Sequence, residues 1–198
     1  NTAAGYRFGY WLYNGAQRQA NPITFYMYSN VDLVAVFVPE EVQTRQLLIL
    51  AQGAGSTNPP EGLYEYPVGT IVSVTATPAT DWVFQKWVFN GSQSTSNPIK
   101  LTLNQNTTLT AFFIPKHTLT ITISGQGTTN PPVGTYKYVE GQQLQVYASP
   151  AWGWSFQKWI LNGSQSTTNP ITIQITKDLT LQAVFIQGQP PTPPQIPI

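Results

Sequence analysis

Few side chains in this protein are suited to acid–base or nucleophilic chemistry. Cysteine is absent, and the single histidine, His117, lies in a short segment that connects two copies of a repeat. A serine–histidine–aspartate triad would have to use this histidine, and a zinc site needs further ligands beside it. No second histidine, cysteine or cluster of carboxylates accompanies it. We therefore expect His117 to be a solvent-exposed linker residue, and we expect no metal site and no cofactor.

The acidic residues are few and scattered. A glycosidase needs two carboxylates that face one cleft, and no acidic residue recurs at matching positions in the two whole copies of the repeat. We therefore expect no catalysis by this chain. The eight acidic residues are Asp32, Glu40, Glu41, Glu61, Glu65, Asp81, Glu140 and Asp178.

Two lysines, Lys86 and Lys158, lie between apolar neighbours in a repeated Phe-Gln-Lys-Trp motif. The simplest interpretation is a half-buried aliphatic stem with the ammonium group in water. An alternative is an intramolecular Lys–Asn crosslink, with the asparagine supplied by a nearby strand.

Three asparagines lie in N-glycosylation sequons: Asn90, Asn106 and Asn162. Sequences rich in threonine and asparagine produce such motifs by chance. However, Asn90 and Asn162 lie on the same predicted turn in successive copies, which would expose them. If the chain is secreted by an archaeon or a eukaryote, glycans are expected at these positions.

The composition is unusually poor in charge. Charged residues make up 9% of the 198 residues, against about 25% in an average soluble domain. Nine basic and eight acidic residues leave a net charge of +1, too little to attract nucleic acid or an anionic membrane. No apolar run approaches the roughly 20 residues of a membrane span. The polar, uncharged composition favours an extracellular chain, and we expect Asn1 to begin a mature chain or a fragment.

An internal repeat organises the sequence. Residues 119–185 align without a gap on residues 47–113, at a shift of 72 positions, and residues 5–37 align at a shift of 76 with the second half of the same unit. The sequence thus predicts the C-terminal half of a repeat unit at 1–39, whole units at 47–115 and 116–187, and a Pro-rich tail at 188–198.

Each unit is expected to consist of about five to six short strands, because apolar and polar residues alternate and no helical spacing is present. The fold class is therefore all-β, with small β-grasp-like or sandwich-like units of about 70 residues. Residues 125–134 are predicted to form a turn-rich connection. Alternation breaks between Phe156 and Trp159, which indicates a β-bulge or one helical turn. Asn162 and Gly163 predict a tight turn.

Aromatic side chains are expected to form the core of each unit, because such rings bury large apolar areas. A sugar-stacking platform of exposed rings is the alternative. The predicted core aromatics are Trp11, Trp82, Phe84, Trp87, Trp154, Phe156 and Trp159.

A spaced set of glycine, proline and aromatic residues resembles the divergent internalin-type B repeat, which is related to the Listeria–Bacteroides repeat of surface proteins. The resemblance implies small β units that act as spacers, stalks or adhesive modules in extracellular chains, without catalytic residues. The half-unit departs from the pattern, since units of the family are normally whole. The matching residues are Gly125, Gly127, Thr128, Pro131, Gly134, Tyr136, Gly141, Val146, Ala148, Pro150, Trp154, Phe156, Trp159, Asn169, Pro170 and Phe185.

The repeat favours a non-catalytic cell-surface protein, a stalk or a filament subunit. A half-unit leaves a sheet edge open, and a strand from a neighbouring subunit would close it by β-strand addition. We expect self-association or contact with neighbouring domains of a larger surface protein, and glycans, as partners. The alternative is an accessory or carbohydrate-binding C-terminal region of a larger secreted enzyme or adhesin.

Overall fold

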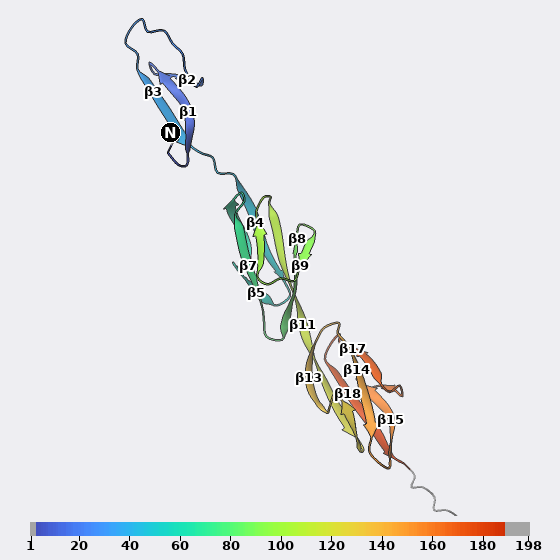
Figure 1. The fold of residues 1–198 in the computed structure, drawn as a ribbon. Coiled ribbons are helices and arrows are strands. Elements are labelled where there is room, and N and C mark those ends of the chain that lie inside the picture. Colours follow the sequence, from blue (N-terminus) through green and yellow to red (C-terminus); the bar gives the residue numbers. More distant parts are fainter. Residues whose placement is uncertain (1–2, 189–198) are drawn as a thin grey trace, which may run out of the picture.

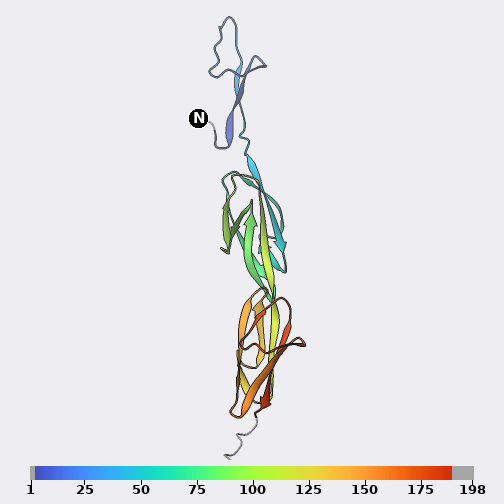
Figure 2. The same ribbon diagram turned by 90° about the vertical axis from the view of Figure 1, so that its right-hand side faces the viewer.

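The computed structural model describes residues 3–188, which form strands and turns without a helix. The tail expected at 188–198 lies outside the described residues except for Gly188. Three parts follow one another in an elongated row, with the N-terminal part at one end (Figures 1 and 2). The prediction of an all-β chain of tandem units is confirmed.

The middle unit, residues 44–115, contains two sheets. The smaller sheet has the order β10-β7-β5, and the larger sheet joins β9, β8, the first half of β11, β4 and β6 in that order. Strand β4 lies parallel to β11, and the other pairs are antiparallel. The strands are β4 (Thr44–Gln52), β5 (Gly55–Asn58), β6 (Gly62–Pro67), β7 (Ile71–Pro78), β8 (Trp82–Phe89), β9 (Ser92–Ser94), β10 (Ile99–Thr102) and β11 (Thr107–Ser124).

The last unit, residues 116–187, repeats this arrangement. Its smaller sheet has the order β12-β14-β17, and the second half of β11 takes the place of β4, parallel to β18. The strands are β12 (Gly127–Asn130), β13 (Gly134–Val139), β14 (Gln143–Pro150), β15 (Trp154–Leu161), β16 (Ser164–Ser166), β17 (Ile171–Gln174) and β18 (Leu179–Gln187).

One core fills the space between the two sheets of each unit. In the middle unit, Leu47 and Ile49 of β4 and Trp87 of β8 belong to the larger sheet, and they share a buried cluster with Val72 and Val74 of the smaller sheet. Alternate residues of each strand point into this cluster, as a half-buried strand requires. Of the two expected shapes, this two-sheet arrangement is the sandwich-like one.

Each whole unit contains two short strands that the sequence did not predict. The connection at residues 125–134 contains strand β12, and a further short strand, β16, follows the turn at Asn162 and Gly163. The break in alternation is a bulge between Phe156 and Lys158 where β15 pairs with β18. The turn has φ angles of 45° at Asn162 and 88° at Gly163, as a two-residue hairpin needs.

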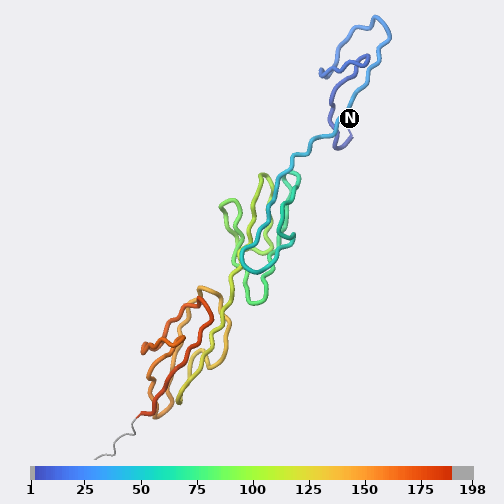
Figure 3. The backbone as a smooth tube through the Cα atoms, turned by 180° about the vertical axis from the view of Figure 1, so that it is seen from behind, coloured from blue at the N-terminus to red at the C-terminus, as the bar shows by residue number. Residues whose placement is uncertain are grey.

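Strand β11 is continuous through both units. Its 18 residues pair with β4 and β8 in the middle unit, and with β13 and β18 in the last unit. Figure 3 shows the chain passing directly from one unit to the next at this strand. The segment at His117, expected to be a linker, is therefore part of a paired strand.

The N-terminal part, residues 5–39, is called the half-unit below. Its three strands, β1 (Tyr6–Tyr13), β2 (Ala16–Arg18) and β3 (Leu33–Pro39), form one sheet in the order β2-β1-β3. They match β8, β9 and the first half of β11. Residues 40–43 lie outside any strand and connect the half-unit to β4.

Candidate functional site

His117 lies at the joint between the middle and last units. Its side chain is 21% exposed, with Nε2 3.5 Å from a carboxylate oxygen of Glu140 and Nδ1 3.8 Å from one of Asp178. The expectation of a solvent-exposed linker histidine is wrong, because β13 pairs beside it and places Tyr138 opposite. Burial raises the pKa of Tyr138, and the neighbouring Tyr136 adds to the effect.

The joint is held by contacts between the two units. The backbone N–H of Lys116 donates to the carbonyl oxygen of Asp81 at 2.7 Å, and the Asp81 carboxylate pairs with the ammonium group of Lys137 on β13. The N–H of Glu140 donates to the carbonyl of Pro115 at 2.9 Å. The half-exposed ion pair adds little stability by itself. The continuous strand and its backbone bonds therefore define the joint.

The first of these backbone bonds recurs at the end of each part. Glu40 donates to Gly5 at 2.8 Å in the half-unit, and Gly188 donates to Gly153 at 2.8 Å in the last unit. Each donor follows the last strand of its part by one position, and each acceptor precedes the aromatic hairpin. The last strand of the half-unit is thus followed by the same backbone hydrogen bond as the last strand of a whole unit.

The carboxylates and the histidine do not form a metal centre in the described residues, where no group of three or more His, Cys, Asp or Glu has suitable geometry. No helix able to cross a membrane occurs between residues 3 and 188.

The repeated lysines face glutamines on the neighbouring hairpin strand. Lys86 Nζ lies 3.1 Å from the side-chain oxygen of Gln93, and Lys158 repeats the contact with Gln165 at 3.1 Å. Lys86 Nζ also lies 5.7 Å from the centre of the Phe112 ring. The carboxamide within reach is thus a glutamine, and the Lys–Asn crosslink considered above lacks its asparagine at these positions.

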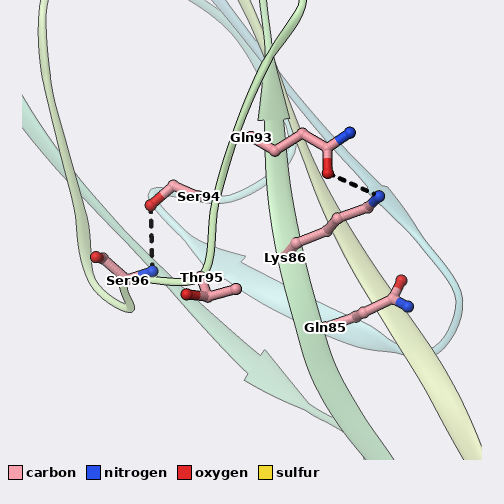
Figure 4. Close-up of a pocket in the computed structure, with 6 residues that line it drawn as sticks. All are labelled: Gln85, Lys86, Gln93, Ser94, Thr95 and Ser96. Carbon is pink, nitrogen blue, oxygen red and sulfur yellow. Dashed lines mark hydrogen bonds between the residues drawn. The ribbon is translucent and has the colours of Figure 1, made fainter.

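A shallow polar groove surrounds Lys86 and Gln93. Its walls are the β8–β9 hairpin and the loop after it, where the Ser96 N–H donates to Ser94 Oγ at 3.2 Å (Figure 4). Amide, hydroxyl and ammonium groups suit a polar, uncharged ligand better than an apolar one. The groove is lined by Gln85, Lys86, Gln93, Ser94, Thr95 and Ser96.

The sequon asparagines have backbone partners. Asn162 Oδ1 accepts hydrogen bonds from the N–H of Thr180 at 2.8 Å and from its hydroxyl at 3.1 Å. Asn90 accepts from the N–H of Thr108 at 3.3 Å. Asn14, which is not in a sequon, makes the same bond to Asp32 at 2.8 Å. The hairpin asparagine therefore has a structural role that is independent of glycosylation.

Asn106 has a different structural role. Its Oδ1 accepts a hydrogen bond from the N–H of Gln46 at 2.9 Å, and Asp178 makes the matching bond to Thr118 at 2.8 Å. Asparagine and aspartate both have a side-chain oxygen that can accept this hydrogen bond, and that oxygen is the atom used at both positions. All three sequon asparagines are exposed, so each is accessible to a glycosylating enzyme.

The predicted core aromatics occupy two kinds of position. Trp87 and Trp159 are fully buried, whereas the other five are half-buried at the edge of the cores. Phe156 packs between Trp159 and Phe185, with ring centres 5.5 and 6.1 Å away. The middle unit repeats this three-ring cluster with Phe84, Trp87 and Phe113, and the half-unit repeats it with Phe8, Trp11 and Phe37.

One tryptophan lies outside every core. Trp152 is 97% exposed, in the loop between β14 and β15. Trp152 is not among the predicted core aromatics. The sequence itself distinguishes Trp152 from the core tryptophans, since Trp152 replaces Thr80 of the middle unit and so is not part of the repeated pattern.

The half-unit exposes apolar side chains whose counterparts are buried. Leu33 is 38% exposed, whereas its counterpart Leu109 is 0% exposed. Phe37 is 46% exposed, against 4% for Phe113. The difference arises because the half-unit has no second sheet within residues 5–39.

Comparison with known families identifies the repeat. The model of the divergent InlB B-repeat domain matches residues 46–116 and 117–189. The chain belongs to the divergent InlB B-repeat family. No curated protein and no solved structure matches it. The resemblance carried by the glycine, proline and aromatic residues is thus confirmed, and B-repeats are typical of extracellular surface proteins. The two matches are repeat domains, and no enzyme family matches.

Proposed function

We propose that this B-repeat chain is a non-catalytic structural protein of the cell surface, a stalk or a filament subunit. The observation that carries the proposal is the continuous strand β11, which belongs to the sheets of two successive units. A shared strand resists bending at the joint more than a flexible linker does, because bending would break paired backbone hydrogen bonds. A rigid row of small units suits a spacer that holds something away from a surface.

The composition supports the same function. Few charges and many threonine, asparagine and glutamine side chains give a surface without a strong electrostatic field. Exposed sequon asparagines are compatible with a glycosylated extracellular chain.

The rigidity of the joint is measurable with spin labels, because the chain has no cysteine. Gln93→Cys and Gln165→Cys place labels at matching exposed positions in the middle and last units. We expect a narrow distribution of distances between them by pulsed electron spin resonance. The matched pair, Gln17→Cys and Gln93→Cys, spans residues 40–43, and we expect a broader distribution. A broad distribution for the first pair would refute the rigid spacer.

Carbohydrate binding is a second candidate, favoured by Trp152. A fully exposed indole offers an apolar face on which a sugar ring can stack. We expect binding on a glycan array to be lost in Trp152→Ala and retained in Trp82→Phe if this function is present. An array without binding by the unmodified chain would exclude this candidate for the glycans displayed.

A further inference from the structure

We propose that each whole unit binds a neutral polysaccharide, in the shallow groove at the β8–β9 hairpin and in its counterpart at the β15–β16 hairpin. The ligand is an uncharged polyhydroxylated chain that the polar side chains of the groove hold at two places along the row. This binding activity goes beyond the structural function proposed above, and the site does not include Trp152.

A β-bulge shapes the groove. Where β8 pairs with β11, the register shifts so that Gln85, between Phe84 and Lys86, is the extra residue. A bulge redirects a side chain and is common beside functional sites. Gln85 is exposed, and Figure 4 shows its side chain extending to the same side of β8 as those of Lys86 and Gln93. The space in front of these side chains has a volume of about 470 Å³.

The chemistry of the groove fits hydroxyl groups. Carboxamides such as that of Gln85 and hydroxyls such as that of Thr95 each donate and accept hydrogen bonds, as a sugar hydroxyl does. The lining residues include no carboxylate, and their one ammonium group, on Lys86, already contacts Gln93 at 3.1 Å. Gln85 and Thr95 form no hydrogen bond with the other lining residues (Figure 4). A ligand can therefore pair with them.

The last unit has the same groove residues in the same arrangement. Its bulge lies between Phe156 and Lys158, and Lys158 contacts Gln165 at 3.1 Å. The N–H of Thr168 donates to Ser166 Oγ at 3.3 Å, as Ser96 does to Ser94. The identical residues, at a shift of 72 positions, are Gln157, Lys158, Gln165, Ser166 and Thr167 for Gln85, Lys86, Gln93, Ser94 and Thr95.

The fold does not require these side chains. The half-unit forms the same bulge, at Gly9, and the same short hairpin between β1 and β2. Gly9 takes the place of Gln85 there, and Arg18 takes the place of Ser94. Bulge and hairpin geometry alone therefore does not explain why the two whole units keep the same polar residues.

Other exposed positions differ between the two whole units. Leu63 of β6 is replaced by Thr135, and Glu65 by Lys137. Substitutions at such positions usually change stability little, so they are free to diverge. The groove residues are as exposed as these positions and have not diverged. A ligand shared by the two units accounts for the difference.

The edge of the sheet at the groove favours a glycan over a peptide strand. Strand β9 pairs with only three residues of β8, Trp87–Phe89, and the groove lies where this pairing stops. A peptide that adds to a sheet needs a regular ladder of backbone groups. The bulge at Gln85 interrupts the ladder at this place. The side chains are therefore the groups that a ligand meets.

The two grooves lie close enough for one polymer to reach both. Leu47 lies opposite Thr107 of β11, and its counterpart Leu119 follows twelve residues further along the same strand. The units therefore repeat about every 40 Å. A shallow groove buries little of each sugar, so one site binds weakly. A chain longer than the repeat contacts both sites, which raises the affinity through effective concentration.

The test measures binding of the full chain to four immobilised neutral polymers: dextran, mannan, laminarin and hydroxyethyl cellulose. We expect at least one to bind, and fragments of it too short to span the repeat to compete about 100-fold more weakly. Gln85→Ala or Gln157→Ala alone should weaken binding about fivefold, the value of one hydrogen bond. The double variant should weaken it about 25-fold, because the contributions of two sites on one polymer multiply.

Two control variants accompany the test. Gln46→Ala with Gln143→Ala removes two glutamines that are exposed outside the grooves, and it should bind as the unmodified chain does. Trp152→Ala should also bind unchanged, which separates the grooves from stacking on the exposed indole. Circular dichroism checks that each variant is folded.

Three outcomes would overturn the proposal. The first is that none of the four neutral polymers binds, and the second is that the double variant Gln85→Ala with Gln157→Ala binds as tightly as the unmodified chain. The third is that binding is confined to heparin, a polyanion, or to β-casein, an unfolded polypeptide, both measured alongside. The spin-label distance across the β11 joint does not depend on any ligand, so the rigid spacer can stand if the grooves bind nothing.

Discussion

At the scale of single residues, the structure combines a repeated ring cluster with repeated asparagine contacts. Trp159 packs against Phe156 with 5.5 Å between ring centres, and the same pair occurs as Trp87 with Phe84. These rings fill units that contain neither a disulfide nor, in residues 3–188, a metal cluster. Aromatic burial therefore supplies much of the stability of each small unit.

Replacing the central tryptophan should unfold its unit. We expect Trp159→Ala to lower the free energy of unfolding of the last unit by about 3–5 kcal/mol, because a fully buried ring is removed and a cavity remains. Urea denaturation followed by circular dichroism measures the loss. The control is Trp152→Ala at the 97% exposed position, where the expected change is within about 0.5 kcal/mol. Equal losses would contradict the assignment of Trp159 to the core.

The hairpin asparagine can be separated from its sequon. Asn162→Ala removes the acceptor for Thr180 and leaves an alanine at a φ of 45°, so we expect a loss of about 1–3 kcal/mol. Ser164→Ala destroys the same sequon and keeps the asparagine. It should leave the stability of unglycosylated protein unchanged, as thermal unfolding would show. If the two variants were equally stable, the asparagine bond would have no structural role.

At the scale of elements, close packing of strand β12 on a ring explains a glycine of the repeat. A Cβ atom on Gly127 would lie 2.5 Å from the Phe185 ring, and Gly55 has the same relation to Phe113. The short strand crosses the ring edge only because no side chain intervenes. The glycine is thus required by packing between two elements.

Gly127→Ala should therefore destabilise the last unit although alanine suits a strand better than glycine does. We expect a loss of about 1–3 kcal/mol from overpacking, measured by urea denaturation. Thr128→Ala, at the next and exposed position of the same strand, is the control and should change stability by less than about 0.5 kcal/mol. A stabilised Gly127→Ala variant would show that the ring moves aside without cost.

At the scale of the whole molecule, the parts differ in how completely they are covered. The two whole units each bury a continuous core between two sheets. The half-unit has a single sheet and keeps Met27 72% exposed. We therefore expect stability to be uneven along the row and lowest in the half-unit.

Amide hydrogen exchange should show this order. We expect amides of β1 to exchange faster than the matching amides of β15 by on the order of tenfold or more, because local opening costs least where few apolar contacts are lost. Mass spectrometry of proteolytic fragments measures both strands in one sample. Equal exchange of β1 and β15 would contradict a less completely covered half-unit.

Local pattern was sufficient to predict the strands, the repeat, the bulge near Phe156 and the turn at Asn162, because alternation, periodicity and positive-φ residues act within a few positions. Pairing between distant strands decided the rest. It made the His117 segment part of β11 and formed β12 inside an expected turn. These features depend on which strand lies alongside, and a strand's own residues do not specify its neighbour.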